Sequence, residues 1–176
     1  MALIAGVDPG KNGAISIIDT KAHVMQSFEM PMYGIKKKVK TVWEPNPAGM
    51  ADILESCDHV YLEHVQYIQG DGGQGSFSFG MNFGMLRGVV GALNIPHTLV
   101  RPAVWKRIMG CTADKDTSIM RATQLFPYCR SFWTRSGKKA YNDGVAESAL
   151  IALYGLSDQR MSLENAVKPK GKVICR

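Results

Sequence analysis

The sequence predicts a single α/β domain in which helices flank a mixed five-stranded sheet, three antiparallel strands being followed by two parallel ones. Short runs rich in Ile and Val alternate with longer segments of helical spacing, which is the pattern expected of such a sheet. The 176 residues fit one domain, and 45% of them are hydrophobic, enough for a sizeable core. We expect this domain to span residues 1–158 and a basic C-terminal tail to occupy residues 159–176.

Three antiparallel strands are predicted to open the chain. Leu3–Asp8 is an apolar run that ends on a carboxylate, and a turn containing Pro9, Gly10 and Gly13 follows it. Residues 15–18 form a β-branched run, and residues 23–30 alternate loosely between apolar and polar side chains. Together these segments predict a three-stranded meander.

Helices and two further strands are predicted to follow the meander. The strands are His59–Glu63, which again ends on a carboxylate, and His97–Val100. Helical segments are predicted over residues 48–56 and 76–94, from Pro102, after the capping residue Asp114, and over residues 143–155. Residues 31–47, which carry four lysines, are interpreted as a solvated loop, residues 70–75 as a flexible loop, and residues 127–141 as an irregular connection.

The helix predicted over residues 76–94 has an unusual glycine face. Gly80, Gly84, Gly88 and Gly91 recur at spacings of three and four, which places them on one side of a helix. Each glycine costs about 1 kcal/mol relative to alanine in a helix interior. We therefore expect this flat face to allow close approach to another element, which could be the sheet, a second subunit or DNA.

Composition limits the functions that need to be considered. The net charge of +6 and the pI of about 9.2 favour a polyanionic partner, nucleic acid first and an anionic membrane second. No leader and no uncharged run long enough to span a membrane is recognised, so we expect an intracellular, cytoplasmic location with the DNA. The four cysteines form no CxxC motif, which argues against a zinc site and indicates a reducing compartment.

Four carboxylates from three predicted elements are candidate metal ligands. Asp8 and Glu63 end strands that are expected to be neighbours, and Asp143 and Glu147 are four residues apart on one helix face. A carboxylate at the end of a buried strand is costly unless a positive group meets it, although Asp8 could instead cap its turn. Oxygen ligands without His or Cys suit Mg²⁺ or Mn²⁺. Because two such ions can promote phosphodiester hydrolysis, we predict a metal-dependent nuclease.

Basic and aromatic side chains interleave immediately before the last predicted helix. Such mixtures bind phosphates and stack on unpaired bases, which favours a DNA-gripping loop over a disordered basic one. The residues concerned are Arg130, Phe132, Trp133, Arg135, Lys138, Lys139 and Tyr141.

Six short motifs occur in a characteristic order between residues 2 and 155. They are Asp8-Pro9-Gly10 with Gly13, Leu62-Glu63-His64-Val65, Gly84-Met85-Leu86-Arg87-Gly88, Pro102 with Trp105-Lys106, Asp114-Lys115, and Asp143 with Ala146-Glu147-Ser148-Ala149-Leu150. The ordered set resembles the RuvC-type Holliday-junction resolvases of the ribonuclease H-like superfamily. A phage or viral branch of that family is one candidate, and membership of it would place the protein in an infected bacterial host. The family's last ligand pair is usually two aspartates three residues apart, whereas here it is Asp143 and Glu147.

The resemblance implies an endodeoxyribonuclease that resolves Holliday junctions and other branched DNA by paired cuts in recombination and repair. It implies a homodimer built through the helix over residues 76–94, and two Mg²⁺ ions per active site, for which Mn²⁺ would substitute. The implied metal ligands are Asp8, Glu63, Asp143 and Glu147, and Lys106 and Lys115 complete the catalytic set as phosphate-contacting lysines. The family's aromatic wedge position falls on Gln66, beside Tyr67. The expected nucleic-acid-binding set is Arg87, Lys106, Lys115, Arg130, Trp133, Arg135, Lys138, Lys139 and Tyr67.

Other functions remain open at this stage. The predicted metal site does not identify the substrate, so a ribonuclease H or a flap-type nuclease is one alternative. A non-catalytic junction-binding protein is another. An actin-like ATPase also begins with a strand, an Asp and a glycine turn, but it needs two such domains and a longer chain than 176 residues.

Overall fold

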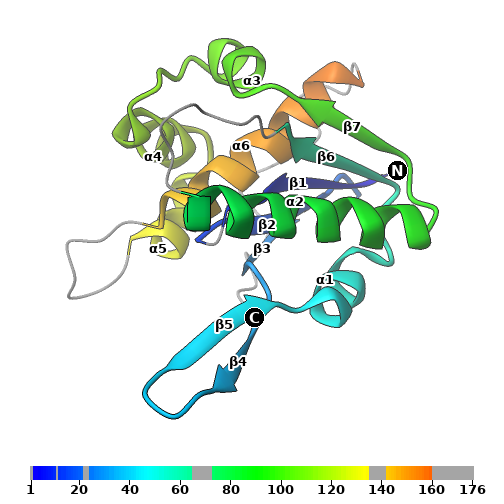
Figure 1. Cartoon of the computed structure of the whole chain (residues 1–176). Helices are drawn as coiled ribbons and strands as arrows, with labels where there is room; N and C mark the ends of the chain where they lie inside the picture. The colour runs from blue at the N-terminus through cyan, green and yellow to red at the C-terminus, as the bar shows by residue number, and fades with distance from the viewer. Residues whose placement is uncertain (1, 11, 22–23, 65–72, 135–141, 160–176) are drawn as a thin grey trace.

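The structure, a computed structural model, describes residues 2–10, 12–21, 24–64, 73–134 and 142–159. Its centre is a five-stranded sheet with the strand order β3-β2-β1-β6-β7 (Figure 1). The first three strands are antiparallel, and the last two run parallel to β1, as the sequence predicted. The strands are β1 (Leu3–Asp8), β2 (Ala14–Asp19), β3 (Val24–Glu29), β6 (His59–Glu63) and β7 (His97–Val100).

Helices cover both faces of this sheet and divide the core in two. On one face, α6 (Asp143–Asp158) packs against β1 and β2, together with α3 (Pro102–Met109), α4 (Lys115–Leu125), the short η1 (Pro127–Cys129) and α5 (Arg130–Trp133). On the other face lie α1 (Pro47–Leu54) and the long α2 (Gly73–Ala92) (Figure 1). Successive residues of a strand point to opposite faces, so Ile4 joins the first core and Ala5 the second.

The register of the central strands fixes where the candidate site lies. β1 and β6 are parallel neighbours, and Val7 is paired with Leu62. The next residue of each strand, Asp8 and Glu63, therefore lies at the same edge of the sheet. Two carboxylates far apart along the chain are brought together by strand pairing alone.

Helix α6 lies directly against the sheet, because β1 presents a glycine to it. A Cβ at Gly6 would overlap the backbone of Ser148 and Ala152 on α6. Near the start of α6, a Cβ at Gly144 would overlap the backbone carbonyl of Asn12. This close approach positions the first two turns of α6, which carry Asp143 and Glu147, beside the end of β1.

The loop predictions were wrong at three places. Within residues 31–47 the chain forms a hairpin of β4 (Met32–Lys36) and β5 (Thr41–Pro45) rather than a solvated loop, because the strands pair in antiparallel register. Helix α2 begins at Gly73, inside the predicted glycine-rich loop, so the glycines do not prevent helix formation there. The segment after Pro127 contains η1 and α5, which pack against α4 and α6.

None of the described helices is long and apolar enough to cross a membrane. Cys57, Cys111 and Cys129 are buried. Cys175 and the predicted tail lie outside the described residues.

Candidate active site

The site lies where the ends of β1 and β6 meet the first turns of α6. Asp8 ends β1 and Glu63 ends β6, while Asp143 and Glu147 lie one helical turn apart on α6. Asn142 caps α6 by accepting a hydrogen bond from the Val145 N–H, and its amide nitrogen donates to Glu29 Oε1 on β3. The start of α6 is thus tied to the sheet, which orients both of its carboxylates.

The negative charges of the other three carboxylates all act on Asp8. Burial first, then the charge of Glu63, and to a smaller extent the charges of Glu147 and Asp143 together raise the pKa of Asp8 to about 7. The Gly10 N–H donates a hydrogen bond to Asp8 Oδ1 at 2.9 Å, and this bond lowers the pKa of Asp8. Turn capping and a place in an acidic cluster therefore coexist at this residue. The excess of negative charge favours the binding of a cation.

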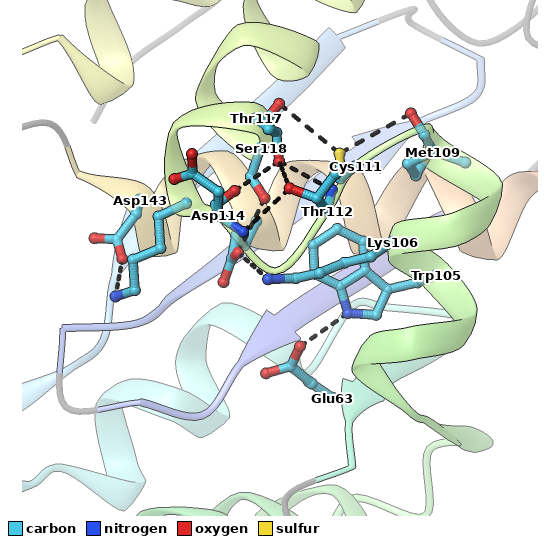
Figure 2. Close-up of polar contacts among 12 residues, drawn as sticks. Glu63, Trp105, Lys106, Met109, Cys111, Thr112, Asp114, Thr117, Ser118 and Asp143 are labelled. Atoms are coloured by element: carbon cyan, nitrogen blue, oxygen red, sulfur yellow. Dashed lines mark hydrogen bonds and ion pairs between the residues drawn. The ribbon is translucent and has the colours of Figure 1, made fainter.

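Glu63 is held by a tryptophan. The Trp105 indole nitrogen donates to Glu63 Oε1 at 2.8 Å, and both side chains are buried (Figure 2). Burial, and to a smaller extent Glu147, raises the pKa of Glu63, whereas the Trp105 hydrogen bond and Lys106 lower it. Trp105 therefore orients Glu63 and favours its ionised form.

Two lysines neutralise the carboxylates of α6. Lys106 Nζ lies 2.8 Å from Glu147 Oε1, which also accepts a hydrogen bond from Ser118 Oγ at 3.0 Å. Lys115 forms an ion pair with Asp143. This hydrogen bond raises the pKa of Lys115, so its ammonium stays charged. Both lysines predicted to be catalytic therefore lie in contact with the predicted metal ligands.

The donor set suits a hard divalent cation. It consists of carboxylate oxygens, the ligands that Mg²⁺ and Mn²⁺ prefer, and two ammonium groups already contribute positive charge among them. In the part of the chain that the structure describes, no three His, Cys, Asp or Glu side chains are grouped closely enough to hold one metal ion. Asp143 and Glu147 would have to exchange a lysine for a metal ion to become ligands.

The pKa of Asp8 predicts a pH-dependent stability of the metal-free protein. An unfolded aspartate titrates near 3.9 and folded Asp8 near 7, so between these values the folded state binds more protons and the free energy of unfolding falls as pH rises. At about 1.4 kcal/mol per pKa unit, the penalty above pH 7 is at most roughly 4 kcal/mol. We expect Asp8→Asn to raise Tm at pH 8 by up to about 10 °C.

Calorimetry of the EDTA-treated protein between pH 4 and pH 8 measures this effect. The difference in Tm between wild type and Asp8→Asn should narrow steadily toward pH 4. Asp52→Asn changes an exposed carboxylate on α1 and serves as the control. A Tm difference that stays constant across the range would contradict the charge assigned to Asp8.

The residues predicted to contact DNA differ in their exposure to solvent. The prediction that Trp133 contacts DNA is wrong, because its ring is fully buried in the core and its indole N–H donates to Thr123 Oγ1 at 3.0 Å. Arg87 and Arg130 are exposed, and the Arg87 guanidinium lies over the Phe83 ring. The wedge position, its neighbour and the remaining members of the basic loop lie outside the described residues: Gln66, Tyr67, Arg135, Lys138, Lys139 and Tyr141.

Several side chains of functional interest were missed by the sequence reasoning. Trp105 was singled out only as part of a motif, and Ser118 not at all, yet each bonds a candidate ligand. Phe77 is exposed in the first turns of α2, as Trp43 is on the β4–β5 hairpin. The available signals were an aromatic side chain between two serines at the start of a predicted helix for Phe77, and an aromatic side chain in a lysine-rich predicted loop for Trp43.

The strand order and the helices on both faces define the α/β fold of ribonuclease H-like proteins. No protein-family model and no curated protein sequence matches the chain. Solved structures of Holliday-junction resolvases, however, share its fold over most of its length.

Three of these structures are particularly informative. RuvC of Thermus thermophilus in complex with a Holliday junction substrate is 12% identical, with a TM-score of 0.58 over 93% of this chain and 98% of that one. A second T. thermophilus RuvC structure is 10% identical, with a TM-score of 0.53 over 90% and 97%. The yeast mitochondrial Holliday junction resolvase Ydc2 is 17% identical, with a TM-score of 0.54 over 92% and 80%. The predicted resemblance to RuvC-type resolvases is thus confirmed at the level of the fold.

Proposed function

We propose that this chain is a divalent-metal-dependent endonuclease that resolves Holliday junctions and other branched DNA by paired hydrolysis of phosphodiester bonds. The observation that supports the proposal is that the charges of Glu63, Asp143 and Glu147 all act on Asp8, while Lys106 and Lys115 are bonded to the two carboxylates of α6. The fold shared with solved resolvases, one of them in complex with a junction, supports branched DNA as the substrate class.

The candidate ligands for the metal are Asp8, Glu63, Asp143 and Glu147. When bound, two Mg²⁺ or Mn²⁺ ions would supply positive charge at the scissile phosphate and lower the pKa of an attacking water. The protein's own contribution is orientation. Trp105 fixes the Glu63 carboxylate, and a buried Ser118 hydroxyl fixes that of Glu147.

Lys106 and Lys115 contribute charge that can be redirected to the substrate. Each ammonium group is held at the site by one carboxylate of α6. If that carboxylate turns toward a metal ion, the lysine is left beside the site without its partner. A phosphate oxygen is then its natural acceptor, since charge-assisted hydrogen bonds are the stronger ones.

The glycine face of α2 supports the predicted homodimer. A Cβ at Gly80, Gly84, Gly88 or Gly91 would meet no described atom within 4 Å outside the helix backbone, so this face does not serve packing against the sheet. The opposite side of α2 provides Leu86 and Val90 to the core. Of the three roles considered for the flat face, a second subunit or DNA therefore remains, and we favour the subunit.

Gly84→Leu is expected to convert the dimer to a monomer, because a leucine would hold two closely packed helices apart. Light scattering over a range of protein concentrations measures the change in mass. Gln124→Leu, which adds an exposed leucine on α4, is the matched control and should remain dimeric. A Gly84→Leu variant with the mass of a dimer would exclude this face as the interface.

A panel of labelled substrates tests the proposed activity. Four-way, three-way, flap and RNA–DNA hybrid substrates are incubated with Mg²⁺, with Mn²⁺ or with EDTA. Paired nicks at symmetric positions of the four-way substrate, absent in EDTA, are the expected result. Preferential cutting of hybrids or flaps would assign the corresponding alternative nuclease, and binding without cutting would identify a junction-binding module.

A further inference from the structure

The hairpin β4–β5 extends away from the central sheet and carries a strongly basic tip (Figure 1). Four lysines lie at or next to this tip, and all are exposed: Lys36, Lys37, Lys38 and Lys40. Trp43 on β5 lies opposite Gly34 on β4, and its ring atoms are 3.5 Å from the point where a Cβ of Gly34 would stand. The ring therefore covers the glycine, yet the residue remains 55% exposed.

A groove separates this face of the hairpin from α2. Trp43 and Lys40 line it from the hairpin, and Ser78, Met81 and Asn82 line it from α2. Asn82 is only 2% exposed, and its carboxamide Oδ1 has no hydrogen-bond partner among the described atoms. A buried acceptor left unpaired costs about 1–3 kcal/mol, so this position is suited to a donor supplied by a ligand.

We propose that the groove binds one unpaired nucleotide of single-stranded or branched DNA. The base would stack on the Trp43 ring and donate an N–H to Asn82 Oδ1, and its phosphate would lie near Lys40. Every nucleobase has a flat face and at least one N–H donor, but base pairing in a duplex occupies the donors of its pairing edge. The site shares no residue with the carboxylate cluster and does not depend on the proposed nuclease activity.

Charge decides between DNA and a second copy of the chain as the occupant. A contact between two such hairpins would bring the lysines of both tips together, on proteins that each carry a net charge of +6. Like charges in close contact are unfavourable, whereas a polyanion releases counterions when it binds lysines. The lysines next to the groove therefore favour a nucleic acid.

Tryptophan fluorescence provides a selective readout. The chain has three tryptophans, and Trp105 and Trp133 are fully buried, so acrylamide quenching reports on Trp43. The full-length wild-type protein in EDTA is titrated with a dT homopolymer of about 15 nucleotides or with a blunt duplex of the same length. We expect the homopolymer to quench the Trp43 emission and shield it from acrylamide, and the duplex to do neither.

Variants are compared by the fluorescence anisotropy of the labelled homopolymer. Trp43→Ala should weaken binding about tenfold, and Trp43→Phe should retain most of the affinity because it keeps a stacking face. Asn82→Leu removes the unpartnered Oδ1 acceptor, so it should weaken binding severalfold. Tyr33→Ala removes an exposed aromatic ring on the opposite face of the same hairpin and should bind as wild type does.

Four results would overturn the proposal. Equal affinities of wild type and Trp43→Ala would exclude stacking, and an equal loss in Tyr33→Ala would mean that the hairpin binds without using the groove. A change in oligomeric mass with unchanged DNA affinity in Trp43→Ala would assign the groove to a second copy. If the protein cuts branched DNA but DNA does not shield Trp43 from acrylamide, the groove proposal is refuted and the proposed nuclease function stands. If DNA shields Trp43 but is not cut, the proposed nuclease function is refuted and the groove proposal stands.

Discussion

Asp8→Asn and Glu63→Gln are each expected to abolish the cutting of branched DNA while leaving DNA binding intact or stronger. Each substitution removes a carboxylate at the joined ends of β1 and β6, where metal ligation is proposed. Loss of such electrostatic stabilisation lowers the rate by roughly a thousandfold or more. Removal of a negative charge also eases the approach of phosphates, so affinity should not fall.

Single-turnover cleavage and gel-shift assays in EDTA measure the two effects separately. Asp116→Asn, which removes an exposed carboxylate in the first turn of α4, is the matched control and should cut at the wild-type rate. Loss of binding in Asp8→Asn would contradict the site assignment. Undiminished cutting by Glu63→Gln would remove Glu63 from the set of ligands.

Gly6→Ala should destabilise the whole domain, although it adds a single methyl group. The new Cβ would overlap the backbone of α6 at Ser148 and Ala152, and a helix backbone cannot move aside as a flexible side chain can. Overpacking of this kind costs about 1–3 kcal/mol or more, and we expect the upper end of that range. A fall in Tm of about 6–12 °C is the corresponding calorimetric result.

Urea denaturation measures the stabilities of Gly6→Ala and of the control variant Gly75→Ala. A Cβ at Gly75, near the start of α2, would meet no described atom within 4 Å outside its own helix, so that variant should be as stable as wild type or slightly more stable. Equal midpoints for the two variants would show that α6 is free to move away from β1. The catalytic geometry depends on the same contact, so Gly6→Ala should also lose activity before it unfolds.

The order of the main elements could be predicted because each segment carries its own pattern. β6 and β7 were predicted with their observed bounds, since each is a short apolar run between turn signals. The hairpin was missed because its strands bury little: Tyr33, Ile35 and Trp43 are exposed, and the lysines obscure any alternation. Its stability comes from strand pairing and from Trp43 covering Gly34, neither of which is visible in local composition.

The candidate site could be predicted in part for a similar reason. Parallel strands end at the same edge of a sheet, so strand positions alone bring Asp8 and Glu63 together. The partners of the carboxylates come from α3 and α4, and local spacing does not encode where these helices lie. Trp133 was misjudged because its basic neighbours suggested an exposed loop, whereas the one-turn helix α5 turns the ring into the core.

The lysine pairs at Asp143 and Glu147 bear on how the protein matures in a cell. With an internal counterion already bonded to each acid of α6, the newly made chain can reach its final shape before any divalent ion arrives. Under the proposed metal dependence, folding and activation would then be separate steps, and the metal-free chain would be folded but inactive.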